Sequence, residues 1–502
     1  MPTAAAPPQL PEDLQQCHQL IGELLSQIRQ LQVRNDWLAR KLFGRSSERL
    51  GVQELEFFGQ ECTVAEPTAP AQEAAPPLAP RNGRVHTGGG RKSLPAELPR
   101  QRVEYDVTES EKICPECGGE KKRIGEETSE QLEYVPASYF VIEHACLKYA
   151  CPRCQGHVSQ GTKPAQPIEK AIAGPGLLAH VITSKYCDHL PLHRQEGILA
   201  RQGLDLTRST LCEWVMASAD ALAPVVRAMK TQILRSAAVN TDDTPLPVQD
   251  ESKTHQAHLW VYVGDAAHPY TLYDFTWTRA RDGPEKFLGD YEGYLQADAW
   301  GGYDGLFGSG KIIEVGCWAH ARRYFFEAKE TDPALANQAL LRIGELYAVE
   351  REAAEGKLDA PARQALRQAK AAPLVESLGQ WLAVITPTLL PKSPIGKAVA
   401  YAQSNWRALT RYLEDGRLAI DNNAAENALR PVVVGRKNWL FTGSRRGGRA
   451  AAILFSLIQS AKRAGLDPFA YLRDLLRAVP THPQSCIHEL FPDQWKKSSA
   501  ES

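Results

Sequence analysis

The sequence predicts a multidomain α+β protein. Its 502 residues exceed what one compact core holds, because domains average roughly 150 residues and a chain of this length therefore favours three or four units. A heptad pattern near the N-terminus, two C-x-x-C pairs, and a central run of short alternating strands followed by helices indicate that these units differ in kind. Hydrophobic residues make up 43% of the chain and charged residues 23%, which excludes a wholly disordered polymer.

Composition also limits where the protein acts and what it binds. The longest apolar run, from Ala450 to Ile458, is shorter than the roughly 18–20 residues that cross a bilayer, and the N-terminus lacks the pattern of a secretory signal. We therefore expect a cytoplasmic protein with no membrane partner. The net charge is −1, so nucleic-acid binding has to come from local clusters of basic residues.

Residues 1–50 are a predicted coiled-coil dimerisation region. Apolar residues recur at alternating spacings of three and four from Leu14 to Leu42, and Asn35 occupies a core position where asparagine favours parallel dimers. An amphipathic helix that packs on its own domain is the alternative. Residues 51–100 follow as a flexible linker, because they are rich in Pro, Ala and Gly and have no periodicity.

Residues 101–165 are predicted to form a zinc ribbon. Two C-x-x-C pairs flank a β-rich stretch, and four thiolates form the tetrahedral ligand set that structural Zn²⁺ prefers. The predicted ligands are Cys114, Cys117, Cys151 and Cys154. A redox dithiol is the weaker interpretation, since two pairs around a hairpin favour zinc. Three nearby side chains are alternatives for the fourth ligand: His144, Cys146 and His157.

Residues 166–236 are predicted to be helical and to resemble a helix-turn-helix. The stretch from Leu192 to Val215 indicates a helix, a tight turn at Gly203, and a second helix capped by Thr207 or Ser209. Recognition helices contact base edges with residues near their N-terminus, and Arg208 and Thr210 occupy that position here. A plain helical hairpin fits the same pattern equally well.

Residues 237–465 are predicted to form the catalytic domain. Alternating apolar residues indicate three strands in a meander, then a helix, a fourth strand, and a fifth strand that leads into a helix. This order predicts a mixed sheet covered by helices, as in ribonuclease-H-like domains. The segments are 236–244, 258–265, 269–277, 280–291, 294–300 and 311–318.

Two carboxylates mark the ends of strands in this domain. We expect Asp242 to close the first strand and Asp298 the fourth, so that they lie side by side and bind Mg²⁺ for phosphoryl transfer. A third carboxylate, Glu426, lies about one turn into a later helix that Asp421 or Asn422 caps. We expect Pro431 to end that helix early.

A basic segment from Val432 to Arg449 follows and contains no acidic residue. Such a segment suits a DNA backbone, and its aromatic residues Trp439 and Phe441 offer surfaces on which unpaired bases can stack. The predicted DNA-binding residues of the whole chain are Arg208, Thr210, Arg430, Arg436, Lys437, Arg445, Arg446 and Arg449.

Taken together, these motifs resemble the transposases of the insertion sequence 66 family, which belong to the Asp-Asp-Glu transposase and integrase group. The resemblance covers nearly the whole chain. It is carried by KLFGRSSERL, the cysteine pairs, TDDTP, LQADAWGGYDG, CWAHARRYFFEA and IDNNAAENALRPVVVGRKNWLFTGSRRGGRAAAILFSLI.

The resemblance implies that Asp242, Asp298 and Glu426 are the metal-binding catalytic residues, with Mg²⁺ or Mn²⁺ at the site and structural Zn²⁺ elsewhere. It implies a helical insertion at about 325–415, and residues 466–502 are left as a C-terminal tail. Cys317 and His320 match a Cys-x-x-His feature of the family, and a nucleophilic role for them is not favoured. Asp243 stands where many relatives have Glu, which leaves open which of the two adjacent acids binds metal.

The resemblance implies a bacterial, nucleoid-associated transposase that cleaves and joins DNA strands. Its expected partners are double-stranded DNA (element ends and target), further copies of the chain in a homodimer or higher oligomer, and small accessory proteins encoded by the same element. Two other functions fit the same residues: a catalytically inactive DNA-binding regulator derived from a transposase, and a nuclease that cleaves without joining.

Overall fold

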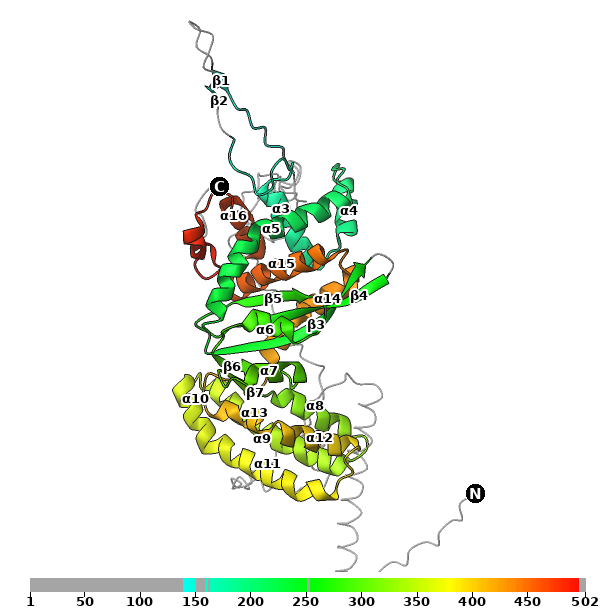
Figure 1. The fold of residues 1–502 in the computed structure, drawn as a ribbon, viewed down its shortest axis with the longest axis vertical. Helices are drawn as coiled ribbons and strands as arrows, with labels where there is room; N and C mark the ends of the chain where they lie inside the picture. The colour runs from blue at the N-terminus through cyan, green and yellow to red at the C-terminus, as the bar shows by residue number, and fades with distance from the viewer. Residues whose placement is uncertain (1–138, 150–158, 161–162, 251–252, 496–502) are drawn as a thin grey trace, which may run out of the picture. The chain divides into compact units, whose positions relative to one another are not determined.

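The computed structural model describes residues 139–149, 159–160, 163–250 and 253–495 (Figure 1). The predicted coiled coil, the linker and the four cysteines predicted to bind zinc lie outside these residues. The chain divides into two compact units, one made of residues 64–163 and the other of residues 1–63 together with 164–502. None of the described helices is both long enough and apolar enough to span a bilayer.

Within the described residues of the unit 64–163, the regular secondary structure is one short pair of β-strands. Strand β1 (Lys148–Tyr149) pairs antiparallel with β2 (Ser159–Gln160). Residues 139–147 have no regular secondary structure, although the sequence predicted a β-rich stretch there. Their apolar side chains, such as Phe140 and Val141, are exposed, so within the described residues no sheet face covers them.

The larger unit is built on a five-stranded mixed sheet with the order β5-β4-β3-β6-β7 (Figure 1). Strand β4 pairs antiparallel with β3 and with β5, whereas β6 pairs parallel with β3 and with β7. The mixed sheet predicted from the alternating pattern is therefore present. Its strands are β3 (Ala238–Asp250), β4 (Lys253–Val263), β5 (Thr271–Thr276), β6 (Gly293–Gln296) and β7 (Ile312–Val315).

Strand β3 continues well past Asp242, which corrects the expectation that Asp242 closes it. Only its first part, Ala238 to Asn240, pairs with β6. Beyond that point the edge of β3 is bound by other groups, since the backbone N–H of Thr442 donates to the Pro247 carbonyl at 2.9 Å. Asp242 therefore lies two residues beyond the pairing with β6 and within the strand.

Helices cover both faces of the sheet because successive strand residues point to opposite sides. Tyr262 of β4 stacks on Phe287 of α6 (Asp282–Leu288), with ring centroids 3.6 Å apart. The adjacent Val261 is paired with Tyr273, which packs against Phe455 on the other face. That second face is covered by α14 (Asn423–Trp439) and α15 (Arg445–Arg463).

The edge strand β5 is closed by hydroxyl groups of α15. The backbone N–H of Thr271 donates to Ser460 Oγ at 3.0 Å, and that of Tyr273 donates to Ser456 Oγ at 2.8 Å. Both serines are fully buried. The N–H groups that would face a sixth strand therefore have partners within the same unit.

The predicted helical region consists of three helices, and the first and third of them pack against α15 and α16 (Pro468–Ala478). The expected turn is present, with Gly203 at φ +83°, a left-handed conformation that glycine adopts readily. Thr207 is the N-cap of the second helix of the motif, as predicted, and its side chain accepts from the Thr210 N–H. The helices are α3 (Pro175–Tyr186), α4 (Leu192–Arg201) and α5 (Arg208–Ile233).

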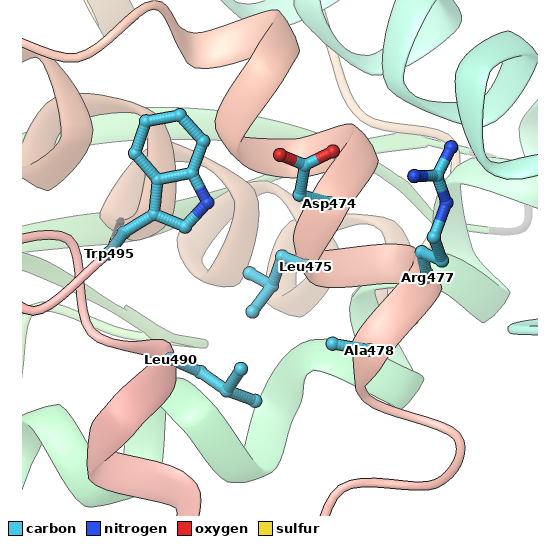
Figure 2. Close-up of a pocket in the computed structure, with 6 residues that line it drawn as sticks. All are labelled: Asp474, Leu475, Arg477, Ala478, Leu490 and Trp495. Atoms are coloured by element: carbon cyan, nitrogen blue, oxygen red, sulfur yellow. The ribbon is translucent and has the colours of Figure 1, made fainter. Parts of the chain in front are cut away.

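Residues 466–495, which belong to the segment expected to be a tail, are also folded. Helix α16 (Pro468–Ala478) buries Tyr471, Leu472 and Leu475, and a 3₁₀ helix, η5 (Gln484–Leu490), follows it. The amphipathic spacing of these residues explains why the segment packs. A shallow apolar hollow of about 250 Å³ lies between α16 and this 3₁₀ helix, where Leu475, Leu490 and Trp495 face one another (Figure 2).

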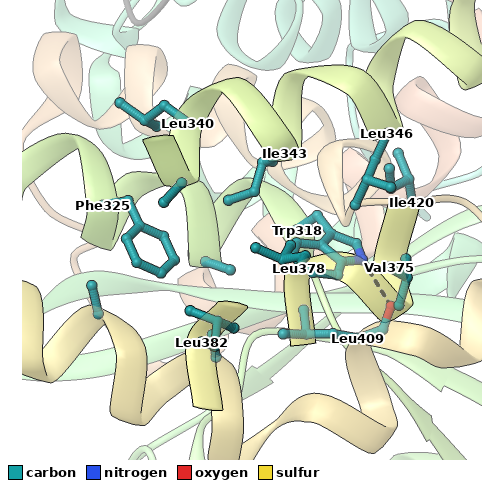
Figure 3. Packing of buried hydrophobic residues seen from close by; sticks show 14 of the residues in the cluster. Trp318, Phe325, Leu340, Ile343, Leu346, Val375, Leu378, Leu382, Leu409 and Ile420 are labelled. Carbon is teal, nitrogen blue, oxygen red and sulfur yellow. Dashed lines mark hydrogen bonds between the residues drawn. The ribbon is translucent and has the colours of Figure 1, made fainter. Parts of the chain in front are cut away.

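The chain between β7 and α14 is mostly helical and has its own apolar core (Figure 3). Trp318 lies at the centre of this core, and its indole N–H donates to the Leu409 carbonyl at 2.8 Å. The α-helices are α8 (Trp318–Ala328), α9 (Pro333–Glu355), α10 (Ala360–Leu366), α11 (Ala372–Ile385), α12 (Pro394–Ser404) and α13 (Trp406–Thr410). Shorter turns are η2 (Arg367–Ala371), η3 (Thr386–Thr388) and η4 (Arg411–Leu413), while η1 (Gly301–Tyr303) and α7 (Asp304–Phe307) connect β6 to β7.

Helix α14 passes through Pro431, so the predicted stop at this proline is wrong. A proline within a helix removes one N–H donor and displaces the preceding turn. The hydroxyl of Tyr273 donates to the Ala428 carbonyl in that turn, and it supplies a partner where the helical hydrogen bonds are disturbed. Packing on the sheet thus lets the helix continue to Trp439.

A buried arginine fastens the helical segment to the chain that leads into α14. Arg367 is fully buried and makes a two-pronged ion pair with Glu350 of α9, each N–O distance being 2.7 Å. Its remaining N–H groups donate to the carbonyls of Tyr412, Asp415 and Leu418. These bonds fix the segment just before Asp421.

We predict that Glu350→Gln destabilises the protein by on the order of 3 kcal/mol, because it leaves the buried guanidinium without a counter-charge. Glu352→Gln on the same helix is the control, since the Glu352–Lys370 pair is about half exposed and such pairs contribute about 1 kcal/mol or less. Urea unfolding of both variants measures the difference. Equal midpoints would contradict the structural role of Arg367.

Candidate active site

Three carboxylates from three elements converge at one end of the sheet. Asp242 lies two residues after Asn240, and Asp298 lies two residues after Gln296. Asn240 and Gln296 are directly in register in the parallel pair of β3 and β6, so the two aspartates extend from the same level of the sheet. Glu426 lies in the first turn of α14, which packs on β3.

The electrostatics of these groups confirm that they are close. The pKa of Asp242 is raised to about 7, mainly by burial and in part by the negative charges of Asp298, Asp243 and Glu426. The backbone N–H of Asp243 opposes this rise, since it donates to Asp242 Oδ1 at 2.7 Å. Burial also raises the pKa of Asp298, against the positive influence of His320 and Arg279.

Asp243 has an arginine and a histidine as partners. Its carboxylate accepts from Arg279 Nε at 2.9 Å and contacts His258 Nδ1 at 2.6 Å. Asp243 is paired across the ladder with Trp260, whereas Asp242 is paired with Val261, so the two acids point to opposite faces of β3. Asp242 shares the face of Asn240, which contacts α14, and it has no cationic partner among the described residues.

Three side-chain amides, those of Asn240, Gln296 and Asn422, lie on the same segments as the carboxylates, and the last two are buried. Asn240 Nδ2 donates to Gln296 Oε1 at 3.1 Å and to Asn422 Oδ1 at 3.0 Å. Gln296 Nε2 donates to the carbonyls of Gly316 and Ala419, and Asn422 Nδ2 donates to the Thr241 carbonyl. We missed these amides in the sequence, where the signal was polar residues inside the strand patterns VNTDD and LQADA and at the start of the α14 motif DNNAAEN.

Helix α8 contributes positive and polar groups beside Glu426. His320 Nδ1 lies 3.6 Å from Glu426 Oε1, and Arg323 lies 4.0 Å from Oε2. Both Glu426 Oε1 and His320 Nδ1 are buried and have no hydrogen-bond partner among the described residues. An orphaned carboxylate oxygen next to two further acids is a donor set that fits a hard divalent cation such as Mg²⁺.

Cys317, His320 and Glu426 form a second possible donor set, with ligand atoms within 4.8 Å of one another. The thiol of Cys317 is already engaged, because its Sγ accepts from the Asn422 N–H at 3.2 Å. Burial raises the pKa of Cys317 to about 12, which keeps it protonated. A protonated, buried thiol is a poor nucleophile, and its contact with Asn422 is the role that the geometry supports.

The basic segment after Pro431 divides into residues with different environments. Arg436 donates to Thr244 Oγ1 at 3.2 Å and to the Pro245 carbonyl, which ties α14 to β3. Arg446 pairs with Glu213 at 2.9 Å and with Asp220 at 2.7 Å, both on α5. These two arginines therefore have partners within the protein. The other predicted DNA-binding residues of this region are exposed: Arg430, Lys437, Arg445 and Arg449.

The aromatic residues of this region also differ in their exposure to solvent. Trp439 is only 8% exposed and has the Lys185 ammonium 5.3 Å from its ring, so it is not a free stacking surface. Phe441 is 43% exposed. The guanidinium carbon of Arg445 lies 3.7 Å from the centre of the Trp277 ring, and Trp277 stacks in turn on His255. This stack holds an exposed guanidinium in place and leaves its N–H edge open to phosphate.

The predicted recognition helix α5 presents only part of its first turn. Arg208 is exposed, and its backbone N–H donates to Glu196 at 2.8 Å. Thr210 is half-buried, and its hydroxyl lies 3.0 Å from that of the capping residue Thr207. Arg208 is thus the more accessible of the two predicted base-contacting residues.

Comparisons with known proteins agree with the motifs over most of the chain. A sequence model described as "Transposase IS66 family" matches residues 170–450. Three others match shorter segments: "Transposase C of IS166 homeodomain" at residues 30–103, "zinc-finger binding domain of transposase IS66" at 111–155, and "IS66 C-terminal element" at 456–492.

Several relatives from Sinorhizobium fredii (strain NBRC 101917 / NGR234) match over most of their length. The uncharacterized protein y4hP is 32% identical, over 94% of this chain and 89% of the relative. The uncharacterized protein y4jD is 32% identical over 97% of both chains, and y4qI is 35% identical over 81% of this chain and 77% of its own. With the family match over more than half of its length, the chain belongs to the IS66 family of transposases.

Proposed function

We propose that the protein is a DNA transposase that binds the ends of an insertion sequence, cleaves a strand, and joins the freed 3′ end to target DNA. The observation that carries this proposal is the convergence of Asp242, Asp298 and Glu426 at one end of the sheet of an IS66-family chain. The strand order, with three antiparallel strands followed by two parallel ones, supports a ribonuclease-H-like assignment of this domain.

Under this proposal the three carboxylates hold Mg²⁺ or Mn²⁺. The bound ion supplies the Lewis acid that activates an attacking oxygen and stabilises the leaving oxygen in phosphoryl transfer. Asp242 faces the site, whereas Asp243 orients Arg279 and His258 from the opposite face. Arg323 and His320, beside Glu426, are placed to contact phosphate oxygens and to balance the charge of the acids.

The proposal also assigns the other segments. The zinc-finger match at residues 111–155 supports a structural Zn²⁺ held by the cysteine pairs, and the N-terminal heptads support a dimer in which two chains act on two DNA ends. We expect double-stranded DNA to run along the exposed arginines of α14 and α15.

We predict that Asp242→Asn, Asp298→Asn and Glu426→Gln each lower strand cleavage on the order of 10³-fold or more, because each removes a charge that holds the cation. DNA binding should survive in all three. Because the residues act as a unit, Asp242→Asn combined with Glu426→Gln should cost little more than either alone. The assay is cleavage of a pre-nicked element end with a target plasmid present.

Asp243→Asn is the matched control in this assay, and we expect it to retain cleavage, since Asp243 pairs with Arg279. Loss in Asp243→Asn with survival in Asp242→Asn would move the metal ligand by one residue. Cleavage without joining in the wild type would identify a nuclease, and DNA binding with no cleavage would identify an inactive regulator.

Arg445 and Arg446 allow a paired test of DNA binding. Arg445→Ala should weaken binding to element-end and random DNA about equally and lower the slope of log affinity against log salt by about one. Arg446→Ala should leave that slope nearly unchanged, because Arg446 is paired with Glu213 and Asp220. Filter binding across a salt series measures both. An equal fall in slope for the two variants would contradict the assignment of Arg445 to DNA contact and of Arg446 to ion pairs within the protein.

Sequence-specific binding is predicted to depend on Arg208. Arg208→Ala should lower the ratio of element-end to random-DNA affinity by roughly 5- to 100-fold, the range for loss of one good base contact. Arg201→Ala on α4 is the control, since Arg201 is exposed and its side chain donates to the Gly197 carbonyl. If Arg208→Ala leaves the ratio unchanged, this helix pair is a spacer.

A further inference from the structure

The three carboxylates are carried by separate pieces of chain, and side-chain amides next to the carboxylates form hydrogen bonds between those pieces. Asn240 precedes Asp242 by two residues, Gln296 precedes Asp298 by two, and Asn422 precedes Glu426 by one helical turn. Asn240 bonds to both of the other amides. Each amide is therefore close in sequence to one acid and bonded in space to the segment that carries another.

The remaining bonds of these amides go to backbone groups of the same segments. Gln296 reaches the carbonyls of Gly316 at 3.2 Å and Ala419 at 2.8 Å, which joins β6 to the chain on either side of the helical segment. Asn422 bonds to the Thr241 carbonyl at 2.9 Å, next to Asp242. The Asn422 backbone N–H donates to the Cys317 thiol, so the start of α14 is held against the start of α8 as well.

Because two of the three amides are buried, loss of any of their hydrogen bonds is costly in free energy. Gln296 is 2% exposed and Asn422 is fully buried, so any amide group left without a partner has no access to water. The bonds accordingly favour one relative position of β3, β6 and α14. That position brings together three carboxylates, whose like charges oppose their convergence.

We propose that Asn240, Gln296 and Asn422, together with the Cys317 thiol, are positioning residues that hold Asp242, Asp298 and Glu426 at the spacing of a divalent-cation site. This inference rests on the proposed function and deepens it. It also assigns a role to the cysteine of the Cys-x-x-His feature, as an acceptor at the N-terminus of α14.

The test compares Gln296→Met with Gln195→Met in the full-length protein. Gln195 is the matched control because it is 4% exposed and its Nε2 likewise donates to two carbonyls, those of Val181 and Leu190, away from the carboxylates. The readouts are Mn²⁺ binding followed by electron paramagnetic resonance, with Asp242→Asn as the background, and urea unfolding. Mn²⁺ that still binds to the Asp242→Asn protein is subtracted, so the measured affinity refers to the site that depends on Asp242.

We expect both Gln→Met variants to lose similar stability, while Gln296→Met alone raises the Mn²⁺ dissociation constant about 10- to 100-fold, the range for disturbed outer-shell partners. Its cleavage activity should recover partly at high Mn²⁺ concentration. Unchanged Mn²⁺ affinity in Gln296→Met would overturn the inference and show that the amides only stabilise the fold.

Asn240→Ala provides a second variant in case Gln296→Met does not fold, because Asn240 is only half-buried. It should also weaken Mn²⁺ binding about 10-fold or more, and wild-type affinity in a folded Asn240→Ala protein would overturn the inference. If the wild-type protein itself has no Mn²⁺ site that Asp242→Asn removes, the proposed function fails together with this inference. That result differs from a wild-type site that the amide variants leave intact.

Discussion

The parallel pairing of β3 with β6 is the constraint on which the candidate site depends. It aligns Asn240 with Gln296, so the chain leaves both strands at the same level and carries Asp242 and Asp298 to one end of the sheet. A shift of one residue in this pairing would turn one of the two acids to the opposite face. The adjacent antiparallel pair with β4 then decides which of Asp242 and Asp243 faces α14.

Glu426 reaches the same place by a longer route. After the helices α8 to α13, the chain returns to the sheet and reaches Asp421. Trp318 and Arg367 hold this returning segment by donating to backbone carbonyls, and the Tyr347 hydroxyl donates to Asp421 at 3.0 Å. The helical core is therefore more than a spacer between strand and helix. It sets the direction in which α14 begins, and its first helix places His320 and Arg323 beside Glu426.

Local patterns in the sequence were sufficient for the strands of the mixed sheet and for the turn at Gly203, and they limited the cap to Thr207 or Ser209, because each of these features depends on neighbouring residues. Pro431 was misjudged because the partner that lets the helix continue, Tyr273, lies 155 residues away. The partners of Arg446 lie 233 and 226 residues away on α5, so the sequence showed only a charge. The hydrogen bonds of the three amides were missed for the same reason, because their partners are also distant in the sequence. The predicted coiled coil and zinc ligands stay predictions.

The serine hydroxyls that bond to β5 have a consequence for how copies of this domain can meet. An exposed strand edge is a template on which another chain can add a strand, and it invites aggregation when many copies gather. Ser456 and Ser460 occupy that edge with side chains of the same unit. Copies of this domain are thus discouraged from joining through continuous sheets.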